Sequence, residues 1–96
     1  MTDVDGIDEL LRALAHTARR AILQRCDGAW VAAGDLAVEL DLAPATVSEH
    51  LRVLRKTGLV ELQIDATWRR YRTRRDTLEI AAGHLNNLLS TRTTSR

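Results

Sequence analysis

The chain has 96 residues, a length that accommodates one small domain. Aromatic residues make up only 3% of it and phenylalanine is absent, so we expect an aliphatic core in a domain that gains stability by dimerising. No apolar run approaches the roughly 20 residues of a membrane span, and the acidic start MTDVDGIDEL is unlike a secretory signal. The single cysteine excludes an internal disulfide and fits a reducing cytoplasm.

The formal net charge of +1 conceals an uneven distribution along the chain. Residues 1–42 carry four arginines against eight acids, whereas residues 43–75 carry eight cations against three acids. Residues 76–96 carry two of each sign. Because a binding partner meets a local patch rather than the average charge, the middle of the chain favours a polyanionic partner such as a nucleic acid.

Three short helices are predicted before residue 43. The first spans about two turns and has apolar residues at i, i+3, i+4 and i+7, namely Ile7, Leu10, Leu11 and Leu14. The second begins at Thr17 as N-cap and runs to Cys26, before the Asp27–Gly28 stop signal. Residues 30–31 are predicted to form a very short strand, and residues 35–40 a short helix.

The stretch APATVSEHLRVLRKTG, residues 43–58, predicts a helix with a defined start and end. Pro44 suits the first helical position, and Gly58 suits the left-handed residue just past the end. Val47, Leu51 and Leu54 fall on one apolar line. The opposite face is small at its N-terminal end and cationic at its C-terminal end, which fits base edges and phosphates; the alternative is an ordinary amphipathic helix with a solvated face.

After Gly58 the hydrophobic period changes from 3.6 to 2, which predicts a β-hairpin of residues 59–64 and 68–73 with an arginine-rich return strand. A last helix is predicted to begin near Asp76. Its apolar residues have the 3-4-3 spacing of a helix–helix seam: Leu78, Ala81, Leu85 and Leu88. We expect this face, helped by the first helix, to meet a second copy of the chain. The core would span residues 7–90, and the polar tail 91–96 would be frayed.

This order of helices and hairpin is the winged helix-turn-helix layout, mainly α with a small β-hairpin wing (α+β). The chain resembles the ArsR/SmtB family of bacterial transcriptional repressors in LRALAHTARRAIL, GDLAVELDLAPATVSEHLRVLRKTGLVE and WRRYR. The resemblance implies a cytoplasmic homodimer rather than an enzyme. It would bind a near-palindromic double-stranded DNA operator through two recognition helices about 34 Å apart.

The resemblance also implies site residues, position by position. Near the bases it places Pro44, Ala45, Thr46, Ser48, Glu49 and His50. Toward phosphates it places Arg52, Arg55 and Lys56, with wing arginines Arg69, Arg70 and Arg72. At the dimer interface it places Ile7, Leu10, Leu11 and Leu14 with Leu78, Ala81, Leu85 and Leu88.

Two features depart from the family pattern. Ala43 and Pro44 stand where the family commonly has polar residues, and Glu49 stands where it often has a basic residue. An acid facing DNA is repulsive unless it accepts from a cytosine amino group or pairs with Arg52 one turn on. We therefore expect affinity to depend on the wing and the C-terminal end of the recognition helix.

No metal site or cofactor is expected, and no inducer is identified. The family's metal sensors use a thiol pair on the third helix or an Asp/His set on the last, and this chain has neither pattern. We interpret Cys26 as a small core residue rather than a redox sensor, and His84 as a half-buried residue of the dimer face. His16 is expected to orient the junction of the first two helices, and His50 to reach phosphate when protonated.

Two other functions remain open at this stage. One is a winged helix that docks a protein partner, which Glu49 and the Ala/Pro-rich start of the recognition helix favour. The other is a DNA-binding sensor with a ligand or metal at the dimer face near His84. Catalysis is not expected, because the chain has no glycine-rich phosphate loop and no paired metal-ligand motif.

Overall fold

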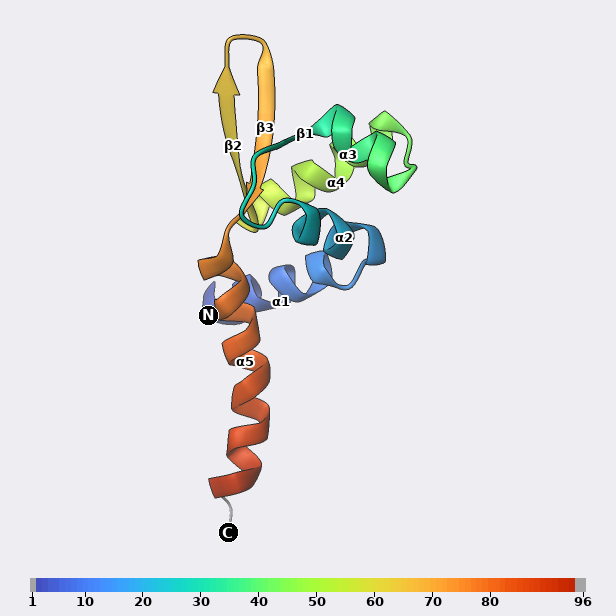
Figure 1. Ribbon diagram of the computed structural model, residues 1–96. Helices are drawn as coiled ribbons and strands as arrows, with labels where there is room; N and C mark the ends of the chain where they lie inside the picture. The colour runs from blue at the N-terminus through green and yellow to red at the C-terminus, as the bar shows by residue number, and fades with distance from the viewer. Residues whose placement is uncertain (1, 95–96) are drawn as a thin grey trace.

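The computed structural model describes the backbone of residues 2–94 and the side chains of residues 6–90. Within that range the chain forms five helices and three strands (Figure 1). They are α1 (Thr2–Leu14), α2 (Thr17–Arg25), β1 (Val31–Ala32), α3 (Ala33–Leu40), α4 (Pro44–Lys56), β2 (Val60–Asp65), β3 (Trp68–Thr73) and α5 (Arg75–Thr94). Helices α1 to α4 form one cluster, from which the β2–β3 hairpin and the outer part of α5 project at opposite ends.

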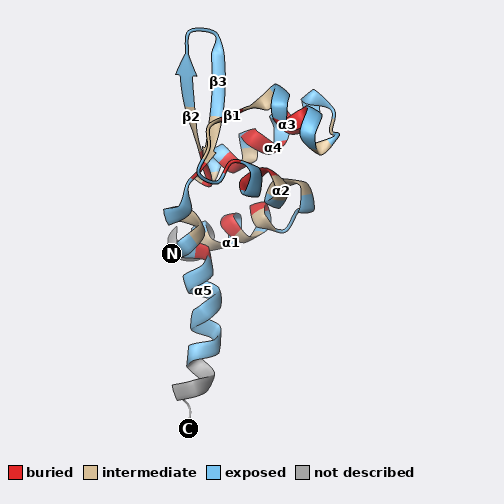
Figure 2. Cartoon of the chain, viewed as in Figure 1, coloured by how far each residue is buried: buried red, intermediate tan, exposed pale blue. Residues whose placement is uncertain are grey.

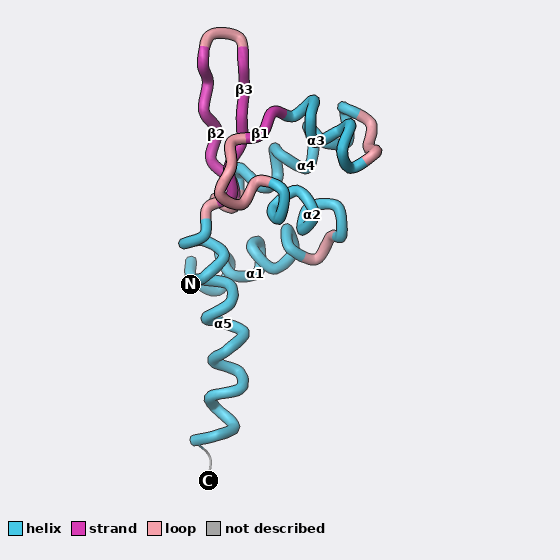
Figure 3. The backbone as a smooth tube through the Cα atoms, viewed as in Figure 1, coloured by secondary structure: helices cyan, strands magenta, loops and turns pink. Residues whose placement is uncertain are grey.

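The sheet has the strand order β1-β3-β2, and both pairings are antiparallel. Tyr71 of β3 lies opposite Val31 of β1 on one side and Leu62 of β2 on the other. The predicted hairpin is thus confirmed, with the short loop at its tip visible in Figure 3. The predicted short strand before the hairpin is β1, at Val31–Ala32, one residue later than predicted.

The core is aliphatic, as the composition predicts. Helix α4 buries the predicted line of Val47, Leu51 and Leu54 completely or almost so, and Ile22 and Leu36 pack in the same cluster. Figure 2 shows that burial is concentrated in α1 to α4 and the base of the hairpin, while the outer hairpin and most of α5 are exposed. The buried line therefore fixes which face of α4 points outward.

Cys26 is fully buried at the end of α2, which confirms its predicted core position. Burial raises the pKa of its thiol to about 11, so the thiol is protonated and unreactive at neutral pH. Its carbonyl accepts from the backbone N–H of Thr73 at 3.1 Å, and the Thr73 hydroxyl donates to the Leu23 carbonyl at 2.7 Å. These bonds tie the end of the hairpin to α2.

Several predicted boundaries need correction. Helix α1 has 13 residues rather than about two turns, and α3 begins at Ala33 rather than near residue 35. Thr17 is the first residue of α2, whose N-cap is His16 with no side-chain capping bond. Helix α5 continues to Thr94, so the frayed tail predicted from residue 91 is helical up to there, and residues 95–96 lie outside the described part. The N-cap residues of α2, α3 and α4 make no side-chain capping bond.

The end of α4 redirects the chain into the hairpin. The Leu59 N–H donates to the Leu54 carbonyl at 2.8 Å, and the Gly58 N–H donates to the Arg55 carbonyl at 3.0 Å. Gly58 has φ +78°, the left-handed conformation that this helix-ending pattern requires and that glycine adopts without a Cβ clash. The predicted role of Gly58 is confirmed.

We predict that Gly58→Ala lowers the free energy of unfolding by about 1–2 kcal/mol, because an L-residue is strained in the left-handed region. Gly34→Ala is the matched control. Gly34 lies in α3 with no atom within 4 Å of an added Cβ, so alanine should be neutral or stabilising there. Urea denaturation of both variants measures the difference, and equal losses would contradict the argument.

Candidate nucleic-acid interface

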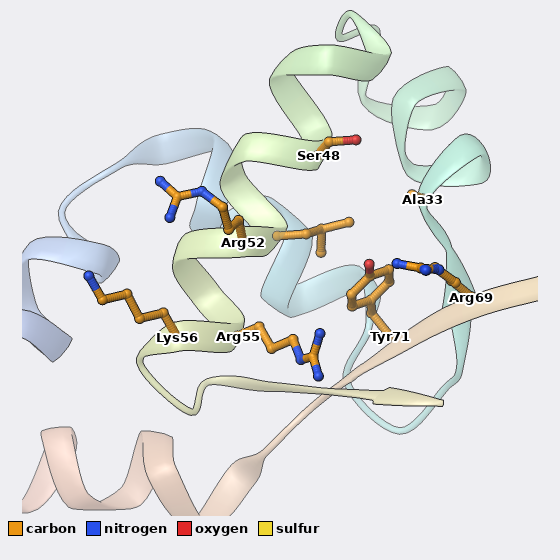
Figure 4. Close-up of a pocket in the computed structure, with 8 residues that line it drawn as sticks. Ala33, Ser48, Arg52, Arg55, Lys56, Arg69 and Tyr71 are labelled. Carbon is orange, nitrogen blue, oxygen red and sulfur yellow. The ribbon is translucent and has the colours of Figure 1, made fainter. Parts of the chain in front are cut away.

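An open groove of about 610 Å³ lies between α4, the start of α3 and strand β3 (Figure 4). Its lining residues come from three elements far apart in sequence: Ala33, Ser48, Leu51, Arg52, Arg55, Lys56, Arg69 and Tyr71. Four of the eight are cations and none is an acid. A groove of this charge, beside the exposed face of a helix-turn-helix, attracts a polyanion.

The N-terminal half of α4 is exposed as predicted. Pro44, Ala45 and Thr46 lie in its first turn, and Ser48 and Glu49 lie in the next. The turn before it, residues 41–43, is short and brings α3 against α4, which is the arrangement of a helix-turn-helix (Figure 3). This end of α4 carries no cation, whereas its last turn carries Arg55 and Lys56.

His50 needs correction as a base-facing or phosphate-facing residue. Its side chain is only 7% exposed, and its Nδ1 accepts from Arg19 Nε at 3.3 Å. The His16 ring meets it edge-on, with centroids 4.6 Å apart. His50 follows Val47 by three residues and precedes Leu54 by four, which places it on the buried line of α4.

Glu49 is paired with Arg52, one of the two arrangements that would relieve its repulsion of DNA. Arg52 donates to both carboxylate oxygens, from Nη2 at 2.6 Å and from Nε at 3.2 Å. The hydrogen bond from Arg52 is the main reason that the pKa of Glu49 is lowered, so the carboxylate stays ionised. The pair offsets the negative charge of Glu49 on the exposed face, and it occupies the Nε and Nη2 donors of Arg52.

The wing arginines divide into paired and unpaired groups. Arg72 donates to Glu61 at 3.0 Å and stacks on Trp30, with its guanidinium 4.4 Å from the ring centroid. Beyond β3, Arg74 pairs with Asp76 at 2.9 Å, and Arg75 pairs with Asp27 at 3.0 Å. These three guanidinium groups are therefore partly neutralised.

Within α4 and the hairpin, four cations lack a carboxylate partner among the described side chains: Arg55, Lys56, Arg69 and Arg70. We call these four residues the cationic rim. Arg70 lies over Trp68, 6.0 Å from the ring centroid. Arg72 was predicted as a DNA contact like the rim residues, although Glu61 and Arg72 fall opposite each other in the hairpin register. Ala33 and Tyr71 line the groove and were not predicted as site residues.

The residues predicted for the dimer interface lie on α1 and α5 with different exposures. Leu10 and Ala81 are 8% and 2% exposed and belong mainly to the chain's own core. Ile7, Leu11, Leu14 and Leu78 are half-buried. Leu85 and Leu88 are exposed, as are Ile80 and Leu89. His84, expected to be half-buried, is exposed in the single chain.

Among the residues that the structure describes, no group of three or more histidine, cysteine or acidic side chains is placed to hold a metal ion. None of the helices in the described range is both long and apolar enough to cross a bilayer.

Comparisons with known proteins agree with this geometry. A family described as a helix-turn-helix domain matches residues 14–63, more than half of the chain. HTH-type transcriptional regulator Rv2034 of Mycobacterium tuberculosis is 42% identical over 53 residues, which are 55% of this chain and 50% of that protein. The chain thus spans about half the length of that curated relative.

Solved structures share the fold along nearly the whole chain. An ArsR-like transcriptional regulator from Rhodococcus sp. RHA1 superposes with a TM-score of 0.87 at 24% identity, covering 99% of this chain and 90% of its own. The homodimeric winged helix-turn-helix domain of Mb0332 from Mycobacterium bovis, a possible ArsR-family regulator, gives 0.76 at 24% identity, with 97% and 85% covered. The fold and groove define a winged helix-turn-helix protein. The chain belongs to the helix-turn-helix domain family whose model matches residues 14–63.

We predict that His50 makes stability depend on pH. Burial lowers the pKa of its imidazole below the usual 6.5, His16 and Arg19 act in the same direction, and Glu49 opposes them. The unfolded chain therefore binds this proton more readily than the folded one. Stability is fully present above pH 6.5 and declines as pH falls through the folded pKa.

Urea denaturation between pH 5.5 and 7.5 measures this dependence. His50→Gln, whose amide oxygen can still accept from Arg19, should flatten the slope, whereas His84→Gln on the exposed part of α5 should keep it. An unchanged slope in His50→Gln would show that another group is responsible.

Proposed function

We propose that the chain is a homodimeric transcriptional repressor of the bacterial cytoplasm, binding a near-palindromic DNA operator. In this proposal the N-terminal half of α4 enters the major groove, and the cationic rim contacts phosphates on either side. The observation that carries it is that Arg55, Lys56 and Arg69 line one groove and lack carboxylate partners among the described residues. Such cations neutralise phosphates and release counterions on binding.

The expected contacts are those predicted from the sequence, with two changes. His50 acts from the buried side of α4 by holding its orientation, and Arg72 supports the hairpin through Trp30 and Glu61 rather than supplying free charge. Pro44, Ala45, Thr46 and Ser48 remain near the bases, and the Glu49–Arg52 pair lies at the middle of the exposed face.

The proposed dimer rests on the apolar exposure of α5. Leu85, Leu88 and Leu89 are 51%, 70% and 69% exposed on a helix whose outer part projects from the helical cluster (Figure 2). Burying leucines of this kind between two copies is favourable by about 1.5–3 kcal/mol each when fully covered. The homodimeric Mb0332 domain has the same fold, and a symmetric pair presents two recognition helices to successive major grooves about 34 Å apart.

Operator affinity should depend on the salt concentration. Fluorescence anisotropy on the DNA upstream of the gene should show affinity falling steeply with salt, because each phosphate contact contributes about 0.9 to the slope of log K against log salt. Arg55→Ala and Arg69→Ala should each reduce the slope by about that amount and weaken binding to all sequences alike. Arg74→Ala is the control, because Arg74 is paired with Asp76 away from the groove.

A flat salt dependence, or equal affinity for the upstream DNA and a random duplex, would contradict operator binding. Retention of the protein on a partner protein but not on heparin or DNA at moderate salt would favour the alternative, a winged helix that docks another protein.

Another prediction concerns assembly. Leu88→Glu places a charge in the proposed interface and should shift sedimentation at micromolar concentration from dimer toward the 10.7 kDa monomer, weakening operator binding with it. Val38→Glu makes the same kind of change on α3, where Val38 is 81% exposed, and should leave the dimer intact. A wild-type chain that sediments as a monomer would contradict the proposed dimer.

A further inference from the structure

The exposed end of α4 has an unusual chemistry for a helix that approaches bases. Ala43 is its N-cap, Pro44, Ala45 and Thr46 form its first turn, and all four are exposed. Their outward groups are methyl and methylene carbons and one hydroxyl. From residue 43 to residue 48 there is no Arg, Lys, Asn or Gln, the side chains that read guanine or adenine by paired hydrogen bonds.

Glu49, which follows on the exposed face, does not supply the missing side chain that would hydrogen-bond a base edge. Glu49 is the only charged side chain in the first two turns, and both of its oxygens accept from Arg52. Arg52 lies a full turn nearer the cationic end of the helix and lines the groove with Arg55 and Lys56. The first turn of α4 is therefore left with apolar contact as its main means of distinguishing bases.

The position of this turn is fixed by the packing behind it. Val47 is fully buried and the Leu51 side chain is 2% exposed, so α4 cannot rotate about its axis without exposing its core line. At 100° per residue, Ala45 points directly away from that line, and Pro44 and Thr46 lie on either side of Ala45. With no long side chain in this turn, the backbone itself can approach the floor of a major groove.

In the major groove, the feature of a base pair that apolar side chains recognise is the C5-methyl group of thymine, which alanine and the threonine methyl contact. We propose that Pro44, Ala45 and Thr46 form a methyl-reading surface that selects thymine in each operator half-site. This inference rests on the proposed operator binding and specifies which bases that site prefers. The selected half-sites should be thymine-rich where the first turn of α4 meets them.

The test begins with duplexes selected by the wild-type protein from a random library. Each thymine of a selected half-site is then replaced singly by deoxyuridine, which keeps base pairing and removes only the C5-methyl. We expect about fourfold weaker binding at one or two positions, the equivalent of one buried carbon. Replacements outside the half-sites should leave affinity unchanged.

A variant separates methyl contact from altered DNA flexibility. Ala45→Gly removes the protein methyl and should weaken binding to the thymine duplex. The variant should bind the deoxyuridine duplex with nearly the same affinity as the thymine duplex, so the effects of the two changes are not additive. Helix weakening alone would lower affinity for both duplexes in proportion.

Two negative results have different meanings. Tight, selective binding that no deoxyuridine replacement weakens would overturn methyl reading while leaving operator binding intact. Selected half-sites with guanine and cytosine where the first turn of α4 meets them would instead indicate that the Glu49–Arg52 pair recognises the bases. That result would also overturn the inference. Failure to select any duplex would contradict the proposed operator binding itself.

Discussion

The burial of one line of side chains on α4 is the constraint on which the rest of the site depends. Val47 and Leu54 are fully buried, and Leu51 nearly so, against the other helices of the cluster. Rotating α4 by even one residue would expose an aliphatic side chain, at a cost of about 1.5–3 kcal/mol. The left-handed turn at Gly58 then leads into β2, and Arg69 of the hairpin lines the same groove as the last turn of α4.

Ion pairing decides where positive charge remains. The chain has 14 basic and 13 acidic residues, so a random distribution would leave little field anywhere. Arg25 pairs with Glu39, Arg72 with Glu61 and Arg75 with Asp27, which neutralises cations at sites around the base of the hairpin and on α2. Exposed pairs of this kind add little stability, but the cations they leave without a carboxylate partner include Arg55, Lys56 and Arg69 at the groove. Their contribution is to the location of the field rather than to the fold.

The parts of this protein that were predictable from sequence are those determined by local period and turn chemistry. The 3-4 spacing of α4, Pro44 and Gly58 at its ends, and the alternation in the hairpin all describe a segment by itself. His50 and Arg72 were assigned to DNA because both lie in segments with the right pattern, yet partners from other elements hold them. Arg19 of α2 bonds His50, and Trp30, before β1, stacks on Arg72. Such partners become visible only when the elements are packed.

The two ends of the molecule have different physical roles, and their separation explains the elongated shape of 55 × 25 × 23 Å. The hairpin and the outward face of α4 carry charge and small polar or methyl groups, whereas the outer half of α5 carries exposed leucines at the opposite end (Figure 1). A helix that projects from its own core gains little from intramolecular packing, since Ala81 is the one buried residue among residues 75–90 of α5. In the proposed dimer, the exposed leucines would be covered far from the groove. Pairing and DNA binding would then not compete for surface, because each copy keeps its rim and its recognition helix free for the duplex.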